Sequence, residues 1–324
     1  MIRRSAARSG MALILALAAI ALGGGLALYL QARAAALART ERAELLRERL
    51  RVAAAEAARE ALWVLAADED LAVDHLGEDW ARPRETNRAD GVSTWAVVED
   101  AGRFVNWNNL AASNRTARDA REILLDLMMF CGDFDAAVRV DALQDYVDAD
   151  EAGTYEADFY RTGAAPQAPP NRALWAPTEL LRVHGFTAEL FRPRPRTDPD
   201  DPTGGDLSAA TVLVPGPLAD PIPVNVNTAG RDVLMGVSGL RQEDAVRQIL
   251  ALRQVQPFES LATMFTAYPE VAALLEGSVG VSSSCFRVRA RAAAEGQHRT
   301  VLAWVERDPR TGDVRILQWL EGEG

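Results

Sequence analysis

The amino-terminal part of the chain combines a long apolar run with a polar continuation of helical character. Residues 11–30 carry no charge and are about as long as a bilayer-spanning helix. Residues 32–65 consist mainly of Ala, Leu, Arg and Glu, contain no Gly or Pro, and place Leu46 and Leu50 at helical spacing. The pattern predicts one unbroken helix that leaves a membrane as an amphipathic stem.

Strand patterns follow at two places. Residues 68–90 are polar and read as a loop. The runs 92–100 and 103–108 alternate around Gly102, which predicts a β-hairpin. Near the carboxyl end, residues 286–320 alternate again and predict three closing strands.

Helical periodicity fills the space between these strands. Apolar residues recur at helical spacing from about Asn114 onward and again over 229–275, and a further helix is predicted over 177–182. The Pro-, Asp- and Gly-rich stretch 191–223 reads as a long surface loop, and the sequence leaves open whether it is ordered. Together the elements predict an α+β fold in which a small antiparallel sheet is interrupted by a large α-helical insertion.

Composition narrows the function classes. Among 324 residues, 48% hydrophobic and 25% charged positions are typical of a globular protein and argue against a polytopic membrane protein. The net charge of -11 disfavours binding to nucleic-acid phosphates, and three histidines with two cysteines exclude a zinc cluster. P-loop, H-E-x-x-H and G-x-S-x-G motifs are missing from the sequence, so we do not predict an enzyme.

The first residues allow three processing histories. Arg3, Arg4 and Arg8 precede the apolar run and are expected to stay cytoplasmic, which places the rest of the chain across the membrane. The segment is a cleaved secretory signal, an uncleaved anchor, or a pilin-type leader cut between Gly10 and Met11. A cut after the apolar run would separate the stem from its membrane segment, and this disfavours the cleaved secretory signal.

Acidic residues gather at 145–160, and hard carboxylate oxygens at this density suit Ca²⁺. An EF-hand does not fit, because Ala152 and Phe159 stand where that loop needs oxygen ligands. A calcium loop and a solvated acidic turn both remain open.

Cys131 and Cys285 both lie beyond the membrane segment, on the side where an oxidising compartment would allow a disulfide between them. Closing so long a loop would restrict the unfolded chain by up to about 5 kcal/mol in the entropy model. Two unpaired thiols are the alternative.

Residues 224–265 resemble the helix-hairpin-helix repeat of some DNA-uptake and repair proteins, in which a Gly-hydrophobic-Gly turn offers backbone N–H groups to a phosphate. Here Arg241 replaces the second glycine, and Glu243 and Asp244 would oppose a phosphate. The alternative role is a compact helical packing unit with its apolar residues inside: Leu234, Val237, Leu240, Ala245 and Ile249.

Five strings in order resemble the minor pseudopilin K subunit of bacterial type II secretion systems, the general secretion pathway protein K family. They are RSGMALILALAAIAL, EDAGRFVNWNNL, LQDYVDADEAGTYEADFY, PNRALWAPTELLRVHGFT and PVNVNTAGRDVL. The resemblance implies cleavage between Gly10 and Met11 by a prepilin peptidase, followed by methylation of the new amino terminus. It also implies a pilin-like fold with this division: leader 1–10, membrane and stem helix 11–65, β region 66–113, inserted helical domain 114–280, and closing β region 281–324.

The resemblance further implies the function of a minor pseudopilin. Such a subunit is a single-pass bacterial inner-membrane protein with its carboxyl-terminal domain in the periplasm. With the I and J minor pseudopilins it would initiate and cap the pseudopilus built from the major pseudopilin, without binding nucleic acid. Leu15 stands where most pilin-like subunits carry a glutamate. A carboxylate buried in the apolar bundle without a charged neighbour above it is costly, so its absence suits the terminal position.

The family also binds calcium, and the acidic string then offers Asp148, Asp150, Glu156 and Asp158 as ligands. Two alternatives to the secretion subunit remain. One is a DNA-binding protein that uses the helix-hairpin-helix-like block, and the other is a minor pilin of a type IV pilus.

Overall fold

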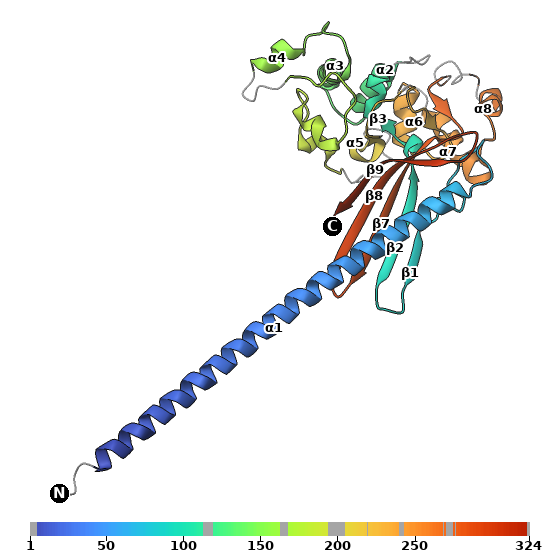
Figure 1. Cartoon of the computed structure of the whole chain (residues 1–324). Helices are drawn as coiled ribbons and strands as arrows, with labels where there is room; N and C mark the ends of the chain where they lie inside the picture. The colour runs from blue at the N-terminus through green and yellow to red at the C-terminus, as the bar shows by residue number, and fades with distance from the viewer. Residues whose placement is uncertain are drawn as a thin grey trace.

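A computed structural model describes residues 5–322 except 113–118, 163–167, 194–204, 219, 240–242, 268, 270–274 and 276. Helix α1 (Ser5–Ala66) runs without interruption for 62 residues and projects far beyond the rest of the molecule (Figure 1). Residues 11–42 are all exposed, and the first buried side chain is Leu46. The predicted continuous helix is confirmed, with only its carboxyl-terminal part packed against the folded body.

The main sheet has five antiparallel strands in the order β1-β2-β7-β8-β9. They are β1 (Arg84–Asn87), β2 (Ser93–Asp100), β7 (Cys285–Ala294), β8 (Gln297–Arg307) and β9 (Val314–Gly322). The stem part of α1 covers one face, where Leu50, Ala54 and Ala58 pack with Val98 and Val288. Alanines on the helix let it approach the sheet closely, and the burial of these apolar side chains holds the two layers together.

The hairpin predicted for 92–100 and 103–108 is wrong. Strand β2 pairs instead with β1, which comes from the stretch predicted as loop, and with β7 near the end of the chain. After Asp100 the chain turns through the 3₁₀ helix η1 (Ala101–Arg103) into the short strand β3 (Val105–Asn106), which pairs in parallel with β4 (Thr211–Val212). The three predicted closing strands are confirmed as β7, β8 and β9.

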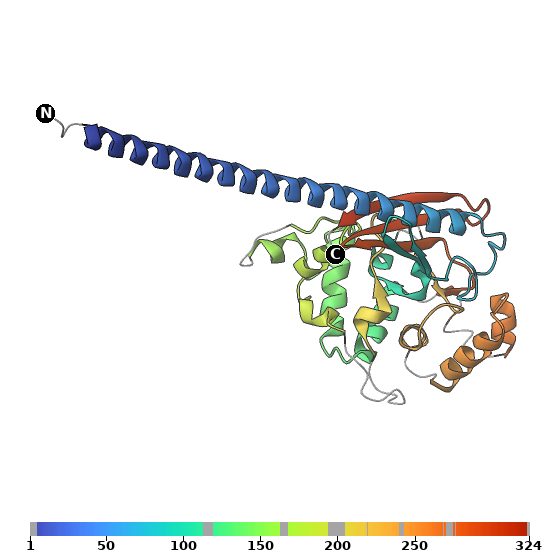
Figure 2. The ribbon, with the colours of Figure 1, turned by 90° about the horizontal axis from the view of Figure 1, so that it is seen from below.

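The helical region lies between β3 and β7 in sequence, as predicted. Its helices and remaining short strands are η2 (Trp107–Ala111), α2 (Ala120–Phe130), α3 (Ala136–Val147), α4 (Ala157–Arg161), η3 (Pro177–Arg182), η4 (Ala188–Phe191), α5 (Leu207–Ala210), β5 (Val224–Asn225), α6 (Arg231–Val237), α7 (Glu243–Val255), α8 (Leu261–Ala267) and β6 (Val279–Gly280). The helix predicted at 177–182 is therefore a 3₁₀ helix. These elements have their own apolar core, and Figure 2 shows them on the side of the sheet away from α1.

The stretch 191–223, predicted as one long loop, is only partly described. Residues 194–204 and 219 lie outside the described part, so the prediction cannot be compared there. The described remainder contains the end of η4, all of α5, and β4, which pairs with β3.

Buried polar side chains fix the start of the helical region and join that region to the sheet. Asn108 donates from Nδ2 to the carbonyl oxygens of Leu174 and Val214, both at 2.8 Å, and its Oδ1 accepts from the Leu174 N–H. At the end of β2, the Asp100 carboxylate accepts from Asn225 Nδ2 at 3.1 Å and from the Thr228 hydroxyl. Because buried polar groups must be hydrogen-bonded, these contacts fix where the insertion begins and ends relative to the sheet.

Candidate metal centre and membrane anchor

An acidic loop joins α3 to α4 and brings three carboxylates together. Asp148 follows the last residue of α3, and Glu156 immediately precedes α4. One oxygen each from Asp148, Asp150 and Glu156 lies within 4.8 Å of the other two. Three of the four predicted ligands are thus collected by a loop that closes between two helix ends.

These carboxylates have oxygen atoms without donors. Asp148 Oδ1 and both carboxylate oxygens of Glu156 are buried and accept no hydrogen bond from the protein. Burial raises the pKa of Asp148 to about 6, and the negative charges of Asp150 and Asp145 add to the effect. Burial likewise raises the pKa of Glu156, with Asp145 as the next cause. Orphaned hard oxygens that repel one another are what a bound Ca²⁺ would satisfy, so the residues fit this ion.

Asp145, in the last turn of α3, shapes this loop. Its Oδ2 accepts a hydrogen bond from the Tyr155 N–H at 2.8 Å. A Cβ atom added to Gly153 would lie 2.2 Å from the same carboxylate, so the backbone folds closely over Asp145. The ligand set inferred from sequence omitted Asp145, although its place one helical turn before Asp148 was a usable signal.

Asp158 does not join the group. Its side chain is 88% exposed and forms an ion pair with Arg161 one turn later in α4. The other side of the loop is aromatic: Tyr155 stacks on His184 with ring centroids 5.0 Å apart, and the Tyr160 hydroxyl accepts from the His184 N–H at 3.0 Å. The loop is thereby held against the chain that follows η3.

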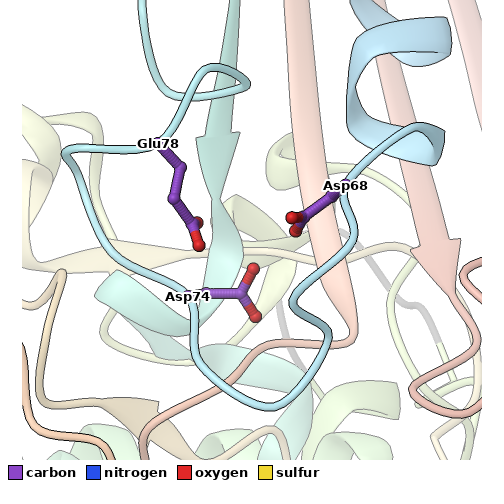
Figure 3. Close-up of side chains that lie close together, drawn as sticks. All are labelled: Asp68, Asp74 and Glu78. Atoms are coloured by element: carbon purple, nitrogen blue, oxygen red, sulfur yellow. The ribbon is translucent and has the colours of Figure 1, made fainter.

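A second group of acids follows α1. Figure 3 shows Asp68, Asp74 and Glu78 directed toward one another from a single loop, and one oxygen of each lies within 4.8 Å of the others. In this group an arginine side chain supplies the positive charge: the Arg307 guanidinium lies 2.7 Å from Asp68 and 2.6 Å from Asp74. This group is a buried ion-pair cluster, and we assign no metal to it.

Glu78 is the member of that cluster with neutral partners. It accepts hydrogen bonds from the His75 N–H at 3.1 Å and from the indole of Trp80. Burial raises the pKa of Glu78 to about 7. The hydrogen bond from the His75 N–H opposes this shift, and the nearby charges of Asp68 and Asp74 add to it.

The free part of α1 has the properties of a membrane segment. From Met11 onward it contains a stretch with mean hydropathy 2.4, long and apolar enough to cross a membrane, and none of that stretch is buried in the molecule. Leu15 is 65% exposed, and the Gly10–Met11 bond lies in the first turns of the helix. The predicted anchor is therefore a projecting apolar rod.

Two comparisons with known proteins show what this chain is similar to. Residues 102–193, which include the acidic loop, match the family model described as type II secretion system, protein K. The resemblance to protein K is confirmed. The fold also matches a chain of the crystal structure of the GspK-GspI-GspJ complex from the enterotoxigenic Escherichia coli type 2 secretion system. The TM-score is 0.69 and the identity 19%, and the match covers 88% of this chain and 100% of that chain. Comparison with curated proteins gave no match. At this identity the likeness to GspK is one of fold.

The two cysteines do not form a disulfide with each other, and they are buried in different places. Cys131 belongs to the core of the helical region, whereas Cys285 packs with Trp304 and Val214 in a small separate cluster. Burial raises the pKa of the Cys285 thiol to about 12. The structure thus has the thiol alternative rather than the disulfide.

The helix-hairpin-helix-like block behaves as a packing unit within the described residues. Leu234, Val237, Ala245 and Ile249 are buried, whereas Leu240 and Arg241, in the turn itself, lie outside the described residues. The Glu243 carboxylate at the start of α7 lies 3.0 Å from Arg231, so an acid occupies the helix end where a phosphate would bind.

Proposed function

We propose that this chain is a K-type minor pseudopilin that acts at the tip of the type II secretion pseudopilus. The observation that carries the proposal is the apolar rod at 11–30, which is fully exposed and projects from a pilin-like body. Such a surface is stable only in lipid or among other apolar helices. A subunit with this shape resides in the membrane and then transfers its rod into the helical core of a filament.

The family supplies the assembly partners. The fold matches one chain of a complex of GspK, GspI and GspJ, and we propose that I and J minor pseudopilins bind this chain as well. The major pseudopilin would form the filament below them. The chain would enter the inner membrane once, with its carboxyl-terminal domain in the periplasm, because Arg3, Arg4 and Arg8 precede the apolar run.

Processing prepares the rod for transfer. Prepilin peptidase would cut between Gly10 and Met11, which removes the three leader arginines, and the new amino terminus would be methylated. Leu15 then lies in the fifth position of the mature chain. Because Leu15 cannot neutralise the amino terminus of a neighbour above it, the subunit is suited to the end of the filament.

The position of the helical region suits a subunit that caps a filament. The helical region lies at the end of the sheet farthest from the amino terminus (Figure 1). A further subunit stacked above would have to share that space. We therefore propose that the chain initiates assembly with its partners and stays at the distal end, with no catalytic role.

The acidic loop gives this cap a structural ion site. We propose that Asp148, Asp150 and Glu156 hold one Ca²⁺, with Asp145 positioning the loop through Tyr155. Asp158 of the predicted set would remain in its pair with Arg161. The ion would join the end of α3 to the start of α4 and so order the segment between them.

Amino-terminal mass spectrometry of the native protein tests the processing step. The account predicts a chain that begins at methylated Met11. A chain that retains Met1, or one cut near residue 34, would exclude the pilin-type pathway. A gel shift with duplex DNA tests the DNA-binding alternative, and salt-sensitive binding at micromolar protein would favour it over the secretion subunit.

A further inference from the structure

Phe134 lies in the turn between α2 and α3, and its side chain is 100% exposed. Two more large apolar side chains flank it in sequence: Met129 in the last turn of α2 is 54% exposed, and Val138 in the first turn of α3 is 40% exposed. We call these three residues the Phe134 surface. Single exposed apolar residues are normal on protein surfaces. Whether the Phe134 surface is a binding site therefore depends on how rigidly the turn holds Phe134.

The turn is fixed on its α2 side. Gly132 has φ of 80°, in the left-handed region that favours glycine. The Gly132 N–H donates to the Met129 carbonyl at 3.0 Å, and the Asp133 N–H donates to the Met128 carbonyl at 2.9 Å. This pair of bonds is a Schellman motif, which ends α2 in one defined geometry immediately before Phe134.

The turn is fixed on its α3 side as well. Asp133 Oδ1 accepts from the Asp135 N–H at 3.0 Å and also pairs with the Arg139 guanidinium. Arg139 Nε in turn donates to the Gly185 carbonyl at 2.7 Å. Phe134 precedes the residue that caps α3, a position whose side chain often packs on the first turn of its helix. Here Arg139 occupies the partner position and is engaged elsewhere, so Phe134 is held outward.

The accessible charge beside Phe134 is negative. The side chain of Asp135 is 75% exposed, whereas that of Arg139, which approaches it at 3.4 Å, is only 15% exposed. A partner therefore meets an aromatic ring with a carboxylate beside it. The complementary surface is an apolar pocket with arginine or lysine at its rim.

We propose that the Phe134 surface is a docking site for a protein partner with an apolar pocket rimmed by basic side chains. A single aromatic residue inserted in a pocket commonly dominates the binding energy of an interface. Because hydrogen bonds on both sides already fix the turn, little conformational freedom is lost when the partner binds. A second copy of this chain is disfavoured as the partner, because the same surface on both copies would bring two Asp135 carboxylates together.

Photo-crosslinking in intact, secreting cells tests the proposal with the full-length chain. A photoreactive phenylalanine analogue is placed at position 134, and the matched control is placed at Val255, which is 88% exposed on α7. We expect a protein adduct from position 134 and none from 255, with a basic residue beside the apolar attachment point in the sequenced crosslinked peptide. Asp135→Arg in the same chain is expected to lower the adduct yield roughly tenfold, equivalent to about 1.4 kcal/mol.

Three results would overturn the proposal: no adduct from position 134, an adduct only to lipid or to a second copy of this chain, or an adduct that Asp135→Arg leaves unchanged. Phe134→Ala separates docking from folding and assembly. Because the ring is fully exposed, its removal should leave the melting temperature and the amount of pseudopilus unchanged while it weakens binding of the captured partner tenfold or more. If Phe134→Ala binds the captured partner with unchanged affinity, the Phe134 surface is not its docking site. If Phe134→Ala instead abolishes pseudopili, filament assembly does not depend on α1 alone.

Discussion

Arg307 and Asp74 form an ion pair inside the molecule: Arg307 Nη2 lies 2.6 Å from Asp74 Oδ1, and the two side chains are 1% and 0% exposed. Arg307 is the last residue of β8, and Asp74 lies in the loop that follows α1. Arg307 Nη1 also reaches Asp68 at 2.7 Å. The pair therefore ties the end of the stem helix to the far end of the sheet.

Removing one member of this pair should destabilise the fold strongly. Asp74→Ala leaves the buried Arg307 guanidinium without its closest carboxylate, and breaking such a pair typically costs about 3–5 kcal/mol. We expect a clear fall in the melting temperature of the detergent-solubilised chain. The control is Arg310→Met, because Arg310 is 87% exposed and its ion pair with Asp308 is long, at 3.9 Å. This substitution should change the free energy of unfolding by no more than about 0.5 kcal/mol. Equal effects of the two variants would contradict this role of the pair.

Stability should depend on the protonation of Glu78. The folded state raises the pKa of Glu78 to about 7 from an ordinary value of 4.5, so the folded protein binds this proton more tightly than the unfolded chain does. Glu78 should therefore make the free energy of unfolding fall as pH rises from about 4.5 to 7, and its own contribution to the slope is at most about 1.4 kcal/mol per pH unit.

Thermal melts across that pH range measure the effect, with Glu78→Gln as the matched variant. The glutamine keeps the shape of the side chain but cannot titrate, so its melts should show a smaller fall between pH 4.5 and 7. Asp68, Asp74, His75 and Arg307 face the same cluster and are unchanged in the variant. An identical pH profile for both proteins would assign the effect to another group.

Calcium should stabilise the helical region through the acidic loop. An ion that binds only the folded state adds about 2.7 kcal/mol at a free concentration one hundred times its Kd. We expect chelator to lower the melting temperature of the native chain and Ca²⁺ to restore it. Asp148→Asn and Glu156→Gln should abolish the response, while Asp158→Asn should keep it because Asp158 is paired with Arg161 outside the group. A response that survives Glu156→Gln, or that is lost in Asp158→Asn, would exclude this ligand set.

Cys131 and Cys285 should both react as buried thiols that are not joined in a disulfide. Alkylation of the native protein should be slow at both positions, because both side chains are buried and burial raises the pKa of the Cys285 thiol. In denaturant without reductant, intact mass should show two added alkyl groups. A protein that takes up none until it is reduced would contain the disulfide that the sequence left open.

The local sequence pattern predicted some helices and strands correctly and missed others, for reasons that lie in particular residues. The sequence predicted helix α1 from its apolar run and the strong helix formers that follow, and it predicted strands β7 to β9 from their alternating pattern. Strand β1 has the sequence RETN and is almost wholly exposed at the edge of the sheet, so no apolar alternation marked it. Its partner β2 was therefore assigned to the wrong neighbour.

The same limit applies to the candidate site. The acidic string was visible, but which of its carboxylates converge depends on how the loop folds over Asp145 at Gly153, and composition does not encode that. The pair of Asp74 and Arg307 joins residues 233 positions apart, beyond any local pattern. Tertiary packing decides both arrangements.

Deletion of this chain from a secreting strain tests the account most directly, with the number of pseudopili and the amount of secreted protein as the two measurements. The account predicts few or no pseudopili and a block in secretion, both restored by the full-length chain but not by a chain that lacks 11–30. Normal pseudopili and normal secretion in the deletion strain would contradict the account, because a filament that starts and ends without this subunit does not need its apolar rod.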